Sequence, residues 1–179
     1  MLNGATVILR AWKEADVPAL QMLRNDVELQ EMLMAEPRPN SLERTRQWLS
    51  ERSGREDGLL FVIATAADDQ PAGFVQISEL DRRNRTAFLG IALLSRSQGM
   101  GLGAEALALL EAYLVRVFRL RKLLLKVLTS NTRAIAFYAA ASFNQAGMLS
   151  RHHASGRGYQ DVLIMEKFLC AASADEDGA

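Results

Sequence analysis

The sequence has no excess of charge of either sign. Lys and Arg together number 21, and so do Asp and Glu, so the formal net charge at pH 7 is zero. Proteins that bind nucleic acid through its phosphates normally carry a basic surface. Nucleic acid is therefore not an expected partner.

Long apolar runs are also absent. No run approaches the roughly 18 apolar residues that a membrane-spanning helix needs, and the N-terminus lacks a basic stretch followed by an apolar segment. We expect a cytoplasmic protein that does not associate with membranes. The one cysteine, Cys170, excludes a disulfide within the chain, and no spacing of His, Cys, Asp or Glu predicts a metal site.

What the chain does contain is enough apolar sequence for one core. It has 179 residues, of which 49% are hydrophobic, a length and composition typical of a single domain. We place that domain at residues 1–170. The remaining residues, 171–179, are small and acidic, which predicts a disordered tail.

Hydrophobic periodicity predicts an alternation of strands and helices. Alternating or continuous apolar residues predict strands over 6–10, 59–65, 73–80, 86–94 and 122–128, and two more between 143 and 169 around a turn at 156–158. Helical spacing predicts helices over 13–24, 41–52, 104–118 and 131–141. This order indicates an α/β (α+β) domain with one mixed, largely antiparallel sheet of about seven strands and about four helices.

A glycine-rich loop, Gln98-Gly99-Met100-Gly101-Leu102-Gly103, joins a predicted strand to a predicted helix. Glycine has no Cβ and readily adopts positive φ, so successive backbone N–H groups can converge on a phosphate at the helix N-terminus. The alternative is a tight turn without a ligand, but such a turn usually needs only one glycine. We therefore predict a phosphate-bearing cofactor.

Two well-known phosphate loops do not fit this spacing. A P-loop requires a lysine directly after its last glycine, and none is present here. A dinucleotide-binding loop reads Gly-x-Gly-x-x-Gly, with an acidic residue at the end of the next strand. Here the glycines follow Gly99-x-Gly101-x-Gly103, and the next strand leads into Thr129-Ser130-Asn131. NAD binding is thus disfavoured.

Two segments resemble the GCN5-related N-acetyltransferase (GNAT) family. Gln98, Gly101 and Gly103 match its Gln/Arg-x-x-Gly-x-Gly/Ala loop, and the segment from Asn131 to Tyr138 is similar to its Asn-x-x-Ala-x-x-x-Tyr helix. The residues around Leu9–Trp12 and Arg24–Asp26, with Trp48, are similar to the branch that contains ribosomal-protein-alanine and spermidine acetyltransferases. The resemblance implies the acyl-CoA N-acyltransferase fold.

The resemblance also implies roles for individual residues. The backbone from Gly99 through Met100, Gly101, Leu102 and Gly103 to Ala104, after Gln98, would hold the pyrophosphate of CoA. Ile91, Ala92 and Leu93 would pair with the pantetheine arm, Asn131 would hydrogen-bond to it, and Tyr138 would act as general acid toward the departing thiolate. Asn131 and Tyr138 are seven residues apart and share one helix face. Alternatively, Asn131 is a helix cap and Tyr138 a core aromatic.

The chain departs from the family where a general base is expected. Relatives carry a glutamate at the position of Phe88 or at that of Lys126. Deprotonation would then use water held by backbone carbonyls, or another carboxylate. Glu79 and Asp81 are the candidates by topology, and we select Glu79 as the second catalytic residue, although a solvated strand end is the alternative.

The acceptor site is the least defined part. In the family it lies largely in the segment between the first two helices, here 25–39, which holds Asp26, Glu28, Glu31 and Glu36. These acids either attract a cationic amine or line a solvated helix. Arg82, Arg83 and Arg85 either meet an acidic acceptor or the 3′-phosphate of CoA, or occupy a solvated turn, and His152 and His153 fit a surface role.

The function indicated is an N-acetyltransferase that uses acetyl-CoA as co-substrate. The acceptor is a primary amine of a small molecule (polyamine, amino sugar or amino acid) or a protein N-terminus, and a homodimer is compatible with the sequence. The alternative is a CoA-binding sensor or interaction module with the same fold and no catalysis.

Overall fold

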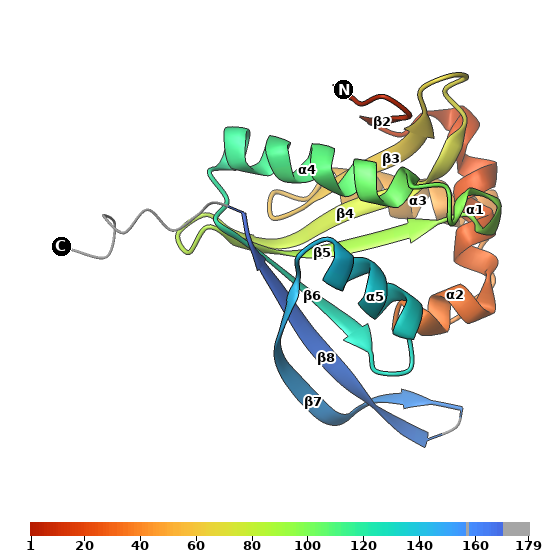
Figure 1. Cartoon of the computed structure of the whole chain (residues 1–179). Coiled ribbons are helices and arrows are strands. Elements are labelled where there is room, and N and C mark those ends of the chain that lie inside the picture. The colour runs from red at the N-terminus through yellow and green to blue at the C-terminus, as the bar shows by residue number, and fades with distance from the viewer. Residues whose placement is uncertain (157, 170–179) are drawn as a thin grey trace.

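The computed structural model describes residues 1–156 and 158–169 and arranges them around one sheet (Figure 1). Cys170 and the acidic tail at 171–179 lie outside the described residues. The sheet has eight strands, namely β1 (Leu2–Asn3), β2 (Val7–Arg10), β3 (Leu59–Thr65), β4 (Pro71–Asp81), β5 (Thr86–Leu93), β6 (Lys122–Leu128), β7 (Asn144–Ser155) and β8 (Gly158–Phe168).

The strand order is β1-β2-β3-β4-β5-β6-β8-β7. Only β5 and β6 are parallel, and every other neighbouring pair is antiparallel. The prediction of a single mixed, largely antiparallel sheet is therefore confirmed. The additional strand is β1, whose two residues are too few to show the period-two pattern by which a strand is detected in sequence.

Five α-helices and two short 3₁₀ turns connect the strands of the described chain. They are η1 (Glu14–Asp16), α1 (Val17–Asn25), α2 (Val27–Met32), α3 (Leu42–Ser53), η2 (Ser95–Ser97), α4 (Leu102–Phe118) and α5 (Thr132–Ala140). The unpredicted helix is α2. It has six residues, none of them buried, so it presents no apolar stripe, and it begins where the Asp26 carboxylate accepts a hydrogen bond from the Leu29 N–H.

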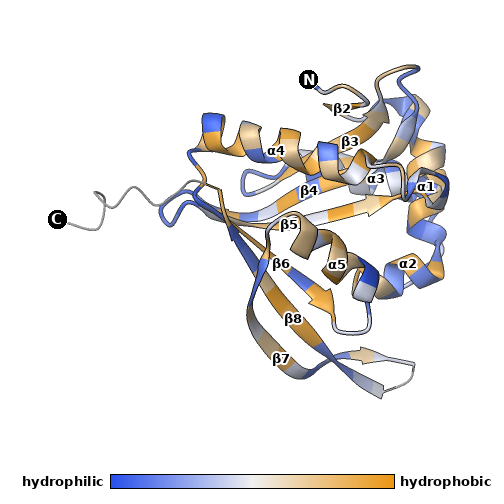
Figure 2. Ribbon diagram, in the orientation of Figure 1, coloured by the Kyte–Doolittle hydropathy of each residue, from blue (hydrophilic) through white to orange (hydrophobic). Residues whose placement is uncertain are grey.

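Helices cover both faces of the sheet, and each face has its own apolar core (Figures 1 and 2). Side chains on one strand alternate between the two cores, as the pleat requires. On β4, Val75 joins the core beneath α4 and α5, whereas Phe74 joins the core beneath α1 and α3. The second core ends near β5, because α1 and α3 pack mainly over β3 and β4.

A buried ion pair fixes the start of α1. Arg10 on β2 donates to both carboxylate oxygens of Asp16, at 2.7 and 3.0 Å, and the two side chains are only 5% and 2% exposed. Asp69, in the turn before β4, accepts from Lys13 and from Arg10, and these two cations hold the pKa of Asp69 below its ordinary value. The first helix is thereby tied to two strands.

Two further observations concern the described residues. None of their helices has the length and apolar character needed to span a bilayer. Nor do His, Cys, Asp and Glu side chains gather there in a group of three or more suited to a metal ion.

Candidate active site

The parallel strands β5 and β6 pair at one end only. Thr86, Ala87 and Phe88 lie opposite residues 122–124, and beyond that point the two strands separate, as Figure 1 shows. β5 continues to Leu93 and β6 to Leu128 without pairing with each other. A strand edge is thereby left open inside the sheet, and an extended molecule can pair with it as a neighbouring strand would.

The direction of the backbone groups on β5 decides which residues face this opening. Leu94 N–H donates to the carbonyl of Ala72, at 2.8 Å, on the β4 side. Since successive residues of a strand present their backbone groups to alternate neighbours, Ala92 also faces β4, whereas Ile91 and Leu93 face the opening. Of the three residues predicted to pair with a cofactor arm, the geometry thus directs two toward the gap.

The glycine loop lies at the open end of β5. Gly99 and Gly101 both have φ of +78°, and no atom lies within 4 Å of the place that a Cβ would occupy at either residue. In the described chain no hydrogen bond engages the N–H groups of residues 99–103, whereas Ala104 and Glu105 donate to Gly101 O. The loop therefore presents free amides and the N-terminus of α4 to open space, as an anion site requires.

Gln98 braces the loop from within. Its Nε2 donates to the carbonyl of Leu93 at 3.0 Å, and its Oε1 accepts from Arg133, in the first turn of α5, at 2.6 Å. The side chain thus joins the end of β5 to α5. Gln98 was predicted to bind the cofactor. Both ends of its carboxamide make hydrogen bonds within the protein, so its side chain holds β5 and α5 in place around the site.

Tyr138 belongs to the last turn of α5 and lies in the core beneath α4 and α5. Its side chain is 7% exposed, and its ring packs edge to face against Phe137 and Phe143, with centroids 5.1 and 5.6 Å away. Phe137 in turn lies against the first turn of α4, because a Cβ at Gly103 would meet its ring at 3.5 Å. Burial raises the pKa of Tyr138 to about 12, so its phenol keeps the proton that a general acid donates.

Asn131 caps α5. Its Oδ1 accepts a hydrogen bond from the Ala134 N–H at 3.1 Å, which leaves its Nδ2 available as a donor. The cap and the predicted contact with a cofactor arm are therefore compatible. The rise of about 1.5 Å per residue puts Asn131 and Tyr138 roughly 10 Å apart along the helix axis.

The two positions without a glutamate come together in space. Lys126 Nζ lies 5.3 Å from the centroid of the Phe88 ring, across the point at which β5 and β6 separate. Phe88 and Ala92 alternate onto the face covered by α1 and α3, opposite to Tyr138. A cation resting on an aromatic ring therefore stands at the two positions where the family resemblance led us to expect a carboxylate.

Glu79 is not brought to the glycine loop. It lies beyond the Ser78–Phe88 pair, level with the closed end of the split, whereas Gly73 pairs with Leu93 at the open end. At about 3.3 Å per residue this separation is roughly 15–20 Å. The side chain is exposed, the residue has φ of +51° in a bulge, and its charge acts on Arg55. No contact joins Glu79 to Tyr138 within the described residues.

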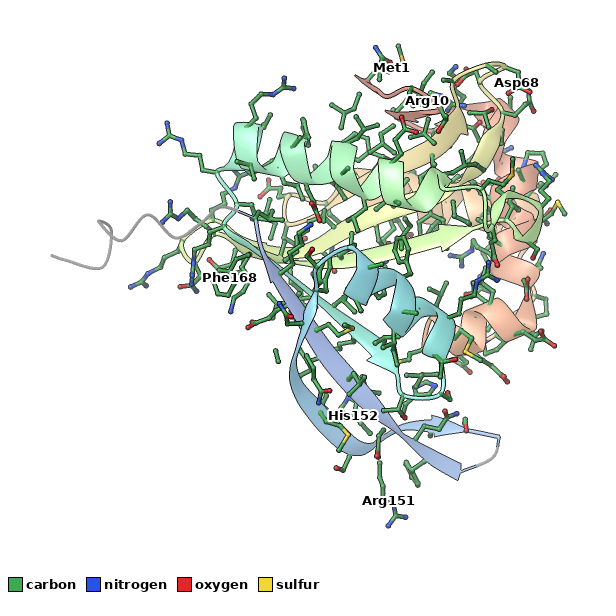
Figure 3. All side chains as sticks on the ribbon, viewed as in Figure 1. Met1, Arg10, Asp68, Arg151, His152 and Phe168 are labelled. Atoms are coloured by element: carbon green, nitrogen blue, oxygen red, sulfur yellow. The ribbon has the colours of Figure 1, made fainter. Side chains whose placement is uncertain are left out.

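The other candidate charges are spread over the surface. Asp81 accepts from Asn84 and Arg83 within the β4–β5 turn, and these hydrogen bonds lower the pKa of Asp81. Arg82, Arg83 and Arg85 belong to the same turn. This turn lies at the start of β5, whereas the glycine loop lies beyond its other end. His152 is exposed on the β7–β8 hairpin, which projects from the body of the molecule (Figure 3).

A second set of residues lies on the sheet face covered by α1 and α3, and sequence reasoning did not bring them together. Arg24 Cζ lies 4.5 Å from the centroid of the Trp48 ring, whose neighbour is Phe74 at 5.3 Å. Two residues after Phe74, the Oε1 atom of Gln76 is buried without a hydrogen-bond partner among the described residues, and the side chain lies against Gly90 of β5. These residues come from three elements, so no local motif marks them.

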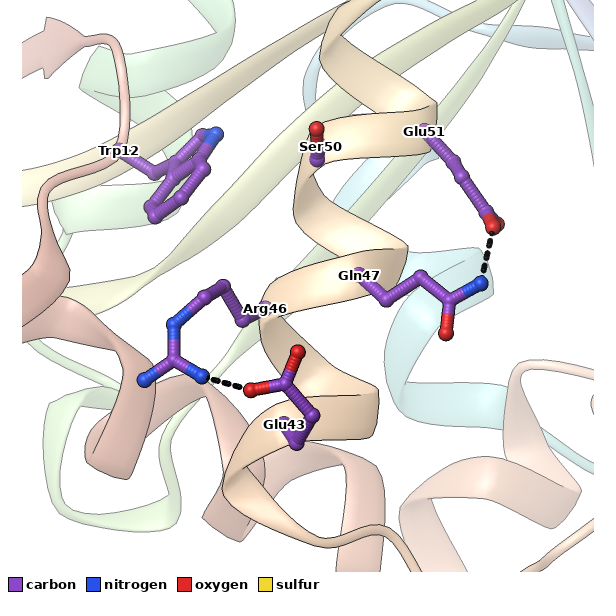
Figure 4. Close-up of a pocket in the computed structure, with 6 residues that line it drawn as sticks. All are labelled: Trp12, Glu43, Arg46, Gln47, Ser50 and Glu51. Atoms are coloured by element: carbon purple, nitrogen blue, oxygen red, sulfur yellow. Dashed lines mark hydrogen bonds and ion pairs between the residues drawn. The ribbon is translucent and has the colours of Figure 1, made fainter.

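A hollow on the outer side of α3 contributes no such chemistry. It is lined by Trp12, Glu43, Arg46, Gln47, Ser50 and Glu51 (Figure 4). Arg46 pairs there with Glu14 and Glu43, and Gln47 donates to Glu51 at 2.8 Å. The charged side chains in these contacts thus already have partners, and none of the residues that line this hollow belongs to β5 or β6.

Comparison with known proteins now decides the family. The model of the acetyltransferase (GNAT) domain matches residues 6–144, a span that contains both motifs and the separating strands. The chain belongs to the GNAT acetyltransferase family. It is thus an acetyl-CoA-dependent N-acetyltransferase with the acyl-CoA N-acyltransferase fold, as its motifs indicated.

Several named acetyltransferases align with nearly the whole chain. Spermidine N(1)-acetyltransferase of Escherichia coli is 26% identical over 168 residues, which are 92% of this chain and 87% of that protein. Spermidine N-acetyltransferase of Vibrio cholerae, solved with CoA and spermine, superposes with a TM-score of 0.83 at 23% identity, over 91% of this chain and 95% of the other. A GNAT acetyltransferase of Bacillus anthracis gives a TM-score of 0.81 at 13% identity, over 94% and 98%.

Proposed function

We propose that the enzyme transfers the acetyl group of acetyl-CoA to a primary amine, either of a small molecule (polyamine, amino sugar or amino acid) or of a protein N-terminus. One observation carries the proposal: the open edge of β5 runs into the free amides of the glycine loop, and Tyr138 lies on the same sheet face. A phosphate cradle, a strand edge and a proton donor would then act on one bound cofactor.

The protein groups fit acetyl-CoA as co-substrate. The amides of residues 99–103 would bind the pyrophosphate, since the absence of side chains at Gly99 and Gly101 leaves room for close approach. The Ala104 amide, which was predicted to join them, donates to Gly101 O. Ile91 and Leu93 would pair with the amides of the pantetheine arm, and Asn131 would donate to it through Nδ2. An N–H group on the β5 edge would polarise the thioester carbonyl.

Acetyl transfer then needs one nucleophile and one acid. The lone pair of the amine attacks the thioester carbon and forms a tetrahedral oxyanion. When that intermediate collapses, the carbon–sulfur bond breaks and the Tyr138 hydroxyl gives its proton to the departing sulfur. The raised pKa of Tyr138, about 12, keeps the phenol protonated at neutral pH before this step.

Removal of the amine proton falls to water and neutral groups. The positions that hold a glutamate in relatives are Phe88 and Lys126, and Glu79 stands at the closed end of the split. Gln76 supplies a buried oxygen without a partner beside Gly90. That oxygen would accept a hydrogen bond from the amine or from the water that deprotonates it, which offsets the penalty of leaving it unsatisfied.

The first test is release of free thiol from acetyl-CoA in the presence of polyamines, amino sugars, amino acids and N-terminal peptides. Spermidine and spermine belong in this panel because the relatives with the names given above act on or bind them. Release with at least one amine class supports the proposal. Tight binding of acetyl-CoA with no thiol release from any acceptor would favour the non-catalytic CoA-binding module instead.

A further inference from the structure

Arg24 is a half-buried cation without a carboxylate partner. Its Nε and Nη2 atoms donate to Asn40 Oδ1 at 3.2 and 2.8 Å, and its Nη1 has no hydrogen-bond partner in the described part of the chain. The guanidinium rests on the Trp48 ring, 4.5 Å from its centroid. Only neutral groups therefore hold this charge in place.

Several other arginines of the molecule have acidic partners. Arg10 pairs with Asp16, Arg46 with Glu14 and Glu43, and Arg55 with Asp57. Arg24 instead has two further cations near it, Arg44 and Arg52. These stand four residues before and after Trp48, on the same side of α3.

The surroundings of Arg24 disfavour its charge. Burial is the main reason that the pKa of Arg24 lies below its ordinary value, and repulsion from Arg44 and Arg52 adds to it. A cation held partly out of water, without an acid, gains more from a bound anion than one that is already paired. The arrangement is typical of an anion-binding residue.

The position of Arg24 connects it to the reaction. It lines a hollow with Asn25, Val27 and residues 37–39, and in Figure 1 both β5 and β6 point toward the side of the molecule that holds α1 and α2. The Trp48 ring, on which Arg24 rests, packs against the ring of Phe74. Phe74 pairs with Ala92 of β5. Two residues after Phe74 comes Gln76, whose Oε1 atom has no hydrogen-bond partner among the described residues.

Acidic groups near the hollow do not offset this charge. Asp26 caps α2 and Glu36 pairs with Arg38, whereas Glu28 and Glu31 are exposed and neither is among the groups that act on Arg24. On the same sheet face Lys126 adds a further cation beside Phe88. Arg24 and Lys126 therefore place positive charge on the sheet face opposite Tyr138. The sequence had left open whether the four acids of 25–39 attract a cationic amine or line a solvated helix, and their contacts and exposure fit the second alternative.

Resting on the proposed acetyl transfer, we infer that the acceptor carries an anionic group, a carboxylate or a phosphate, besides its primary amine, and that Arg24 binds that anionic group. The amine lies toward Gln76 and the anion toward the hollow at the end of α1. A polyamine, which is positive throughout, fits this surface less well.

The test compares acceptors that differ only in the anion. Thiol release is measured with ω-amino acids of two to six carbons against alkylamines of the same length, with 2-aminoethyl phosphate against 2-aminoethanol, and with spermidine. We expect kcat/KM to be about 10- to 100-fold higher for the anionic members, the range of a charge-assisted hydrogen bond. The chain length with the highest value reports the distance between amine and anion, and the phosphate pair separates the two kinds of anion.

Substitution of Arg24 tests whether this residue binds the anionic group of the acceptor. Arg24→Met keeps an apolar stem over Trp48 and should raise KM for the preferred anionic acceptor about 10- to 100-fold, with little change in kcat and none in KM for acetyl-CoA or for dephospho-acetyl-CoA. Arg24→Lys should recover part of the loss. Arg46→Met is the matched control and should change none of these constants, because Arg46 lies on α3 and is already paired with Glu14 and Glu43.

Binding of the anion alone gives a second readout that needs no turnover. In a Trp12→Phe background Trp48 is the only tryptophan, and β-alanine or 2-aminoethyl phosphate should change its fluorescence unless Arg24 is replaced by Met. Three results would overturn this inference without affecting the proposed acetyl transfer. They are equal kcat/KM for anionic and neutral amines, a higher kcat/KM for spermidine, and Trp48 fluorescence that does not change with either anionic compound. Absence of thiol release with every acceptor would overturn the proposed function, and the fluorescence titration would still decide whether Arg24 binds an anion.

Discussion

The two sides of the split between β5 and β6 are built in different ways. The cofactor side, formed by the β5 edge, the glycine loop and α5, comes from residues 91–138 alone. The proposed acceptor side, formed by Arg24, Trp48, Phe74, Gln76 and Lys126, comes from the four elements α1, α3, β4 and β6. A phosphate is bound by backbone amides that one turn can orient, whereas an acceptor is recognised by side chains that distant elements bring together.

The largest effect should come from Tyr138→Phe on the cofactor side. Loss of the general acid should lower kcat about 100-fold or more while the Kd for acetyl-CoA changes less than about two-fold. Tyr113→Phe, at a tyrosine of α4 that packs against Phe61 and Phe118, is the control and should leave kcat unchanged. Full turnover by the Tyr138 variant would remove it from the chemistry.

The pKa of Tyr138 also predicts a dependence on pH. Because burial raises the pKa from 10.0 to about 12, the folded state holds this proton more tightly than the unfolded state. The corresponding part of the stability is complete below pH 10.0 and is lost as pH rises toward 12. Urea unfolding of wild type and Tyr138→Phe across this interval should show the steeper decline only in wild type.

A smaller effect should come from Gly101→Ala. Its φ of +78° makes an L side chain unfavourable by about 1–2 kcal/mol although no atom stands in the way. KM for acetyl-CoA should rise roughly 10-fold because the amides of the loop lose their orientation. Gly147→Ala, on β7 with equal space and no positive φ, is the matched control. A change confined to the acceptor KM would contradict the assignment of the loop to the cofactor side.

The two sides can also be compared through their helix caps. Asn131 caps α5 on the cofactor side, and Asp26 caps α2 beside the acceptor side. Replacement of either by Ala should lower the free energy of unfolding by about 1 kcal/mol. Only Asn131→Ala should also raise KM for acetyl-CoA, and only Asp26→Ala should raise KM for the amine. Identical kinetic effects would mean that the sides are not independent.

The smallest effect is expected for Glu79→Gln. The side chain is exposed at the closed end of the split, so kcat/KM should change less than about two-fold and its pH profile should keep its shape. Arg55→Gln, which removes the cation that the Glu79 charge acts on, is a neighbouring control. Loss of the acidic limb in the Glu79 variant alone would identify it as the missing base.

The sequence predicted helices and strands well where they depend on residues that are close together in the chain. The strands over 59–65 and 122–128 were predicted with the bounds observed, and the helix predicted over 41–52 agrees with α3 to within one residue at each end. The helix α2 and the strand β1 were missed because neither is long enough to show a period. The meeting of Phe88 and Lys126 was not foreseen, although each had been noted as a departure from the family pattern.

The order of strands and helices, the phosphate loop and the pair Asn131 and Tyr138 follow from the chain itself, because hydrophobic period, glycine conformation and helix spacing act over a few residues. The split between β5 and β6, the use of Gln98 as a brace and the surroundings of Arg24 follow only from the folded molecule. They depend on where β5 leaves β6 and on contacts such as that of Arg24 with Trp48, which lie 24 residues apart. Long-range packing, which no local pattern encodes, therefore forms the surface that we propose for the acceptor.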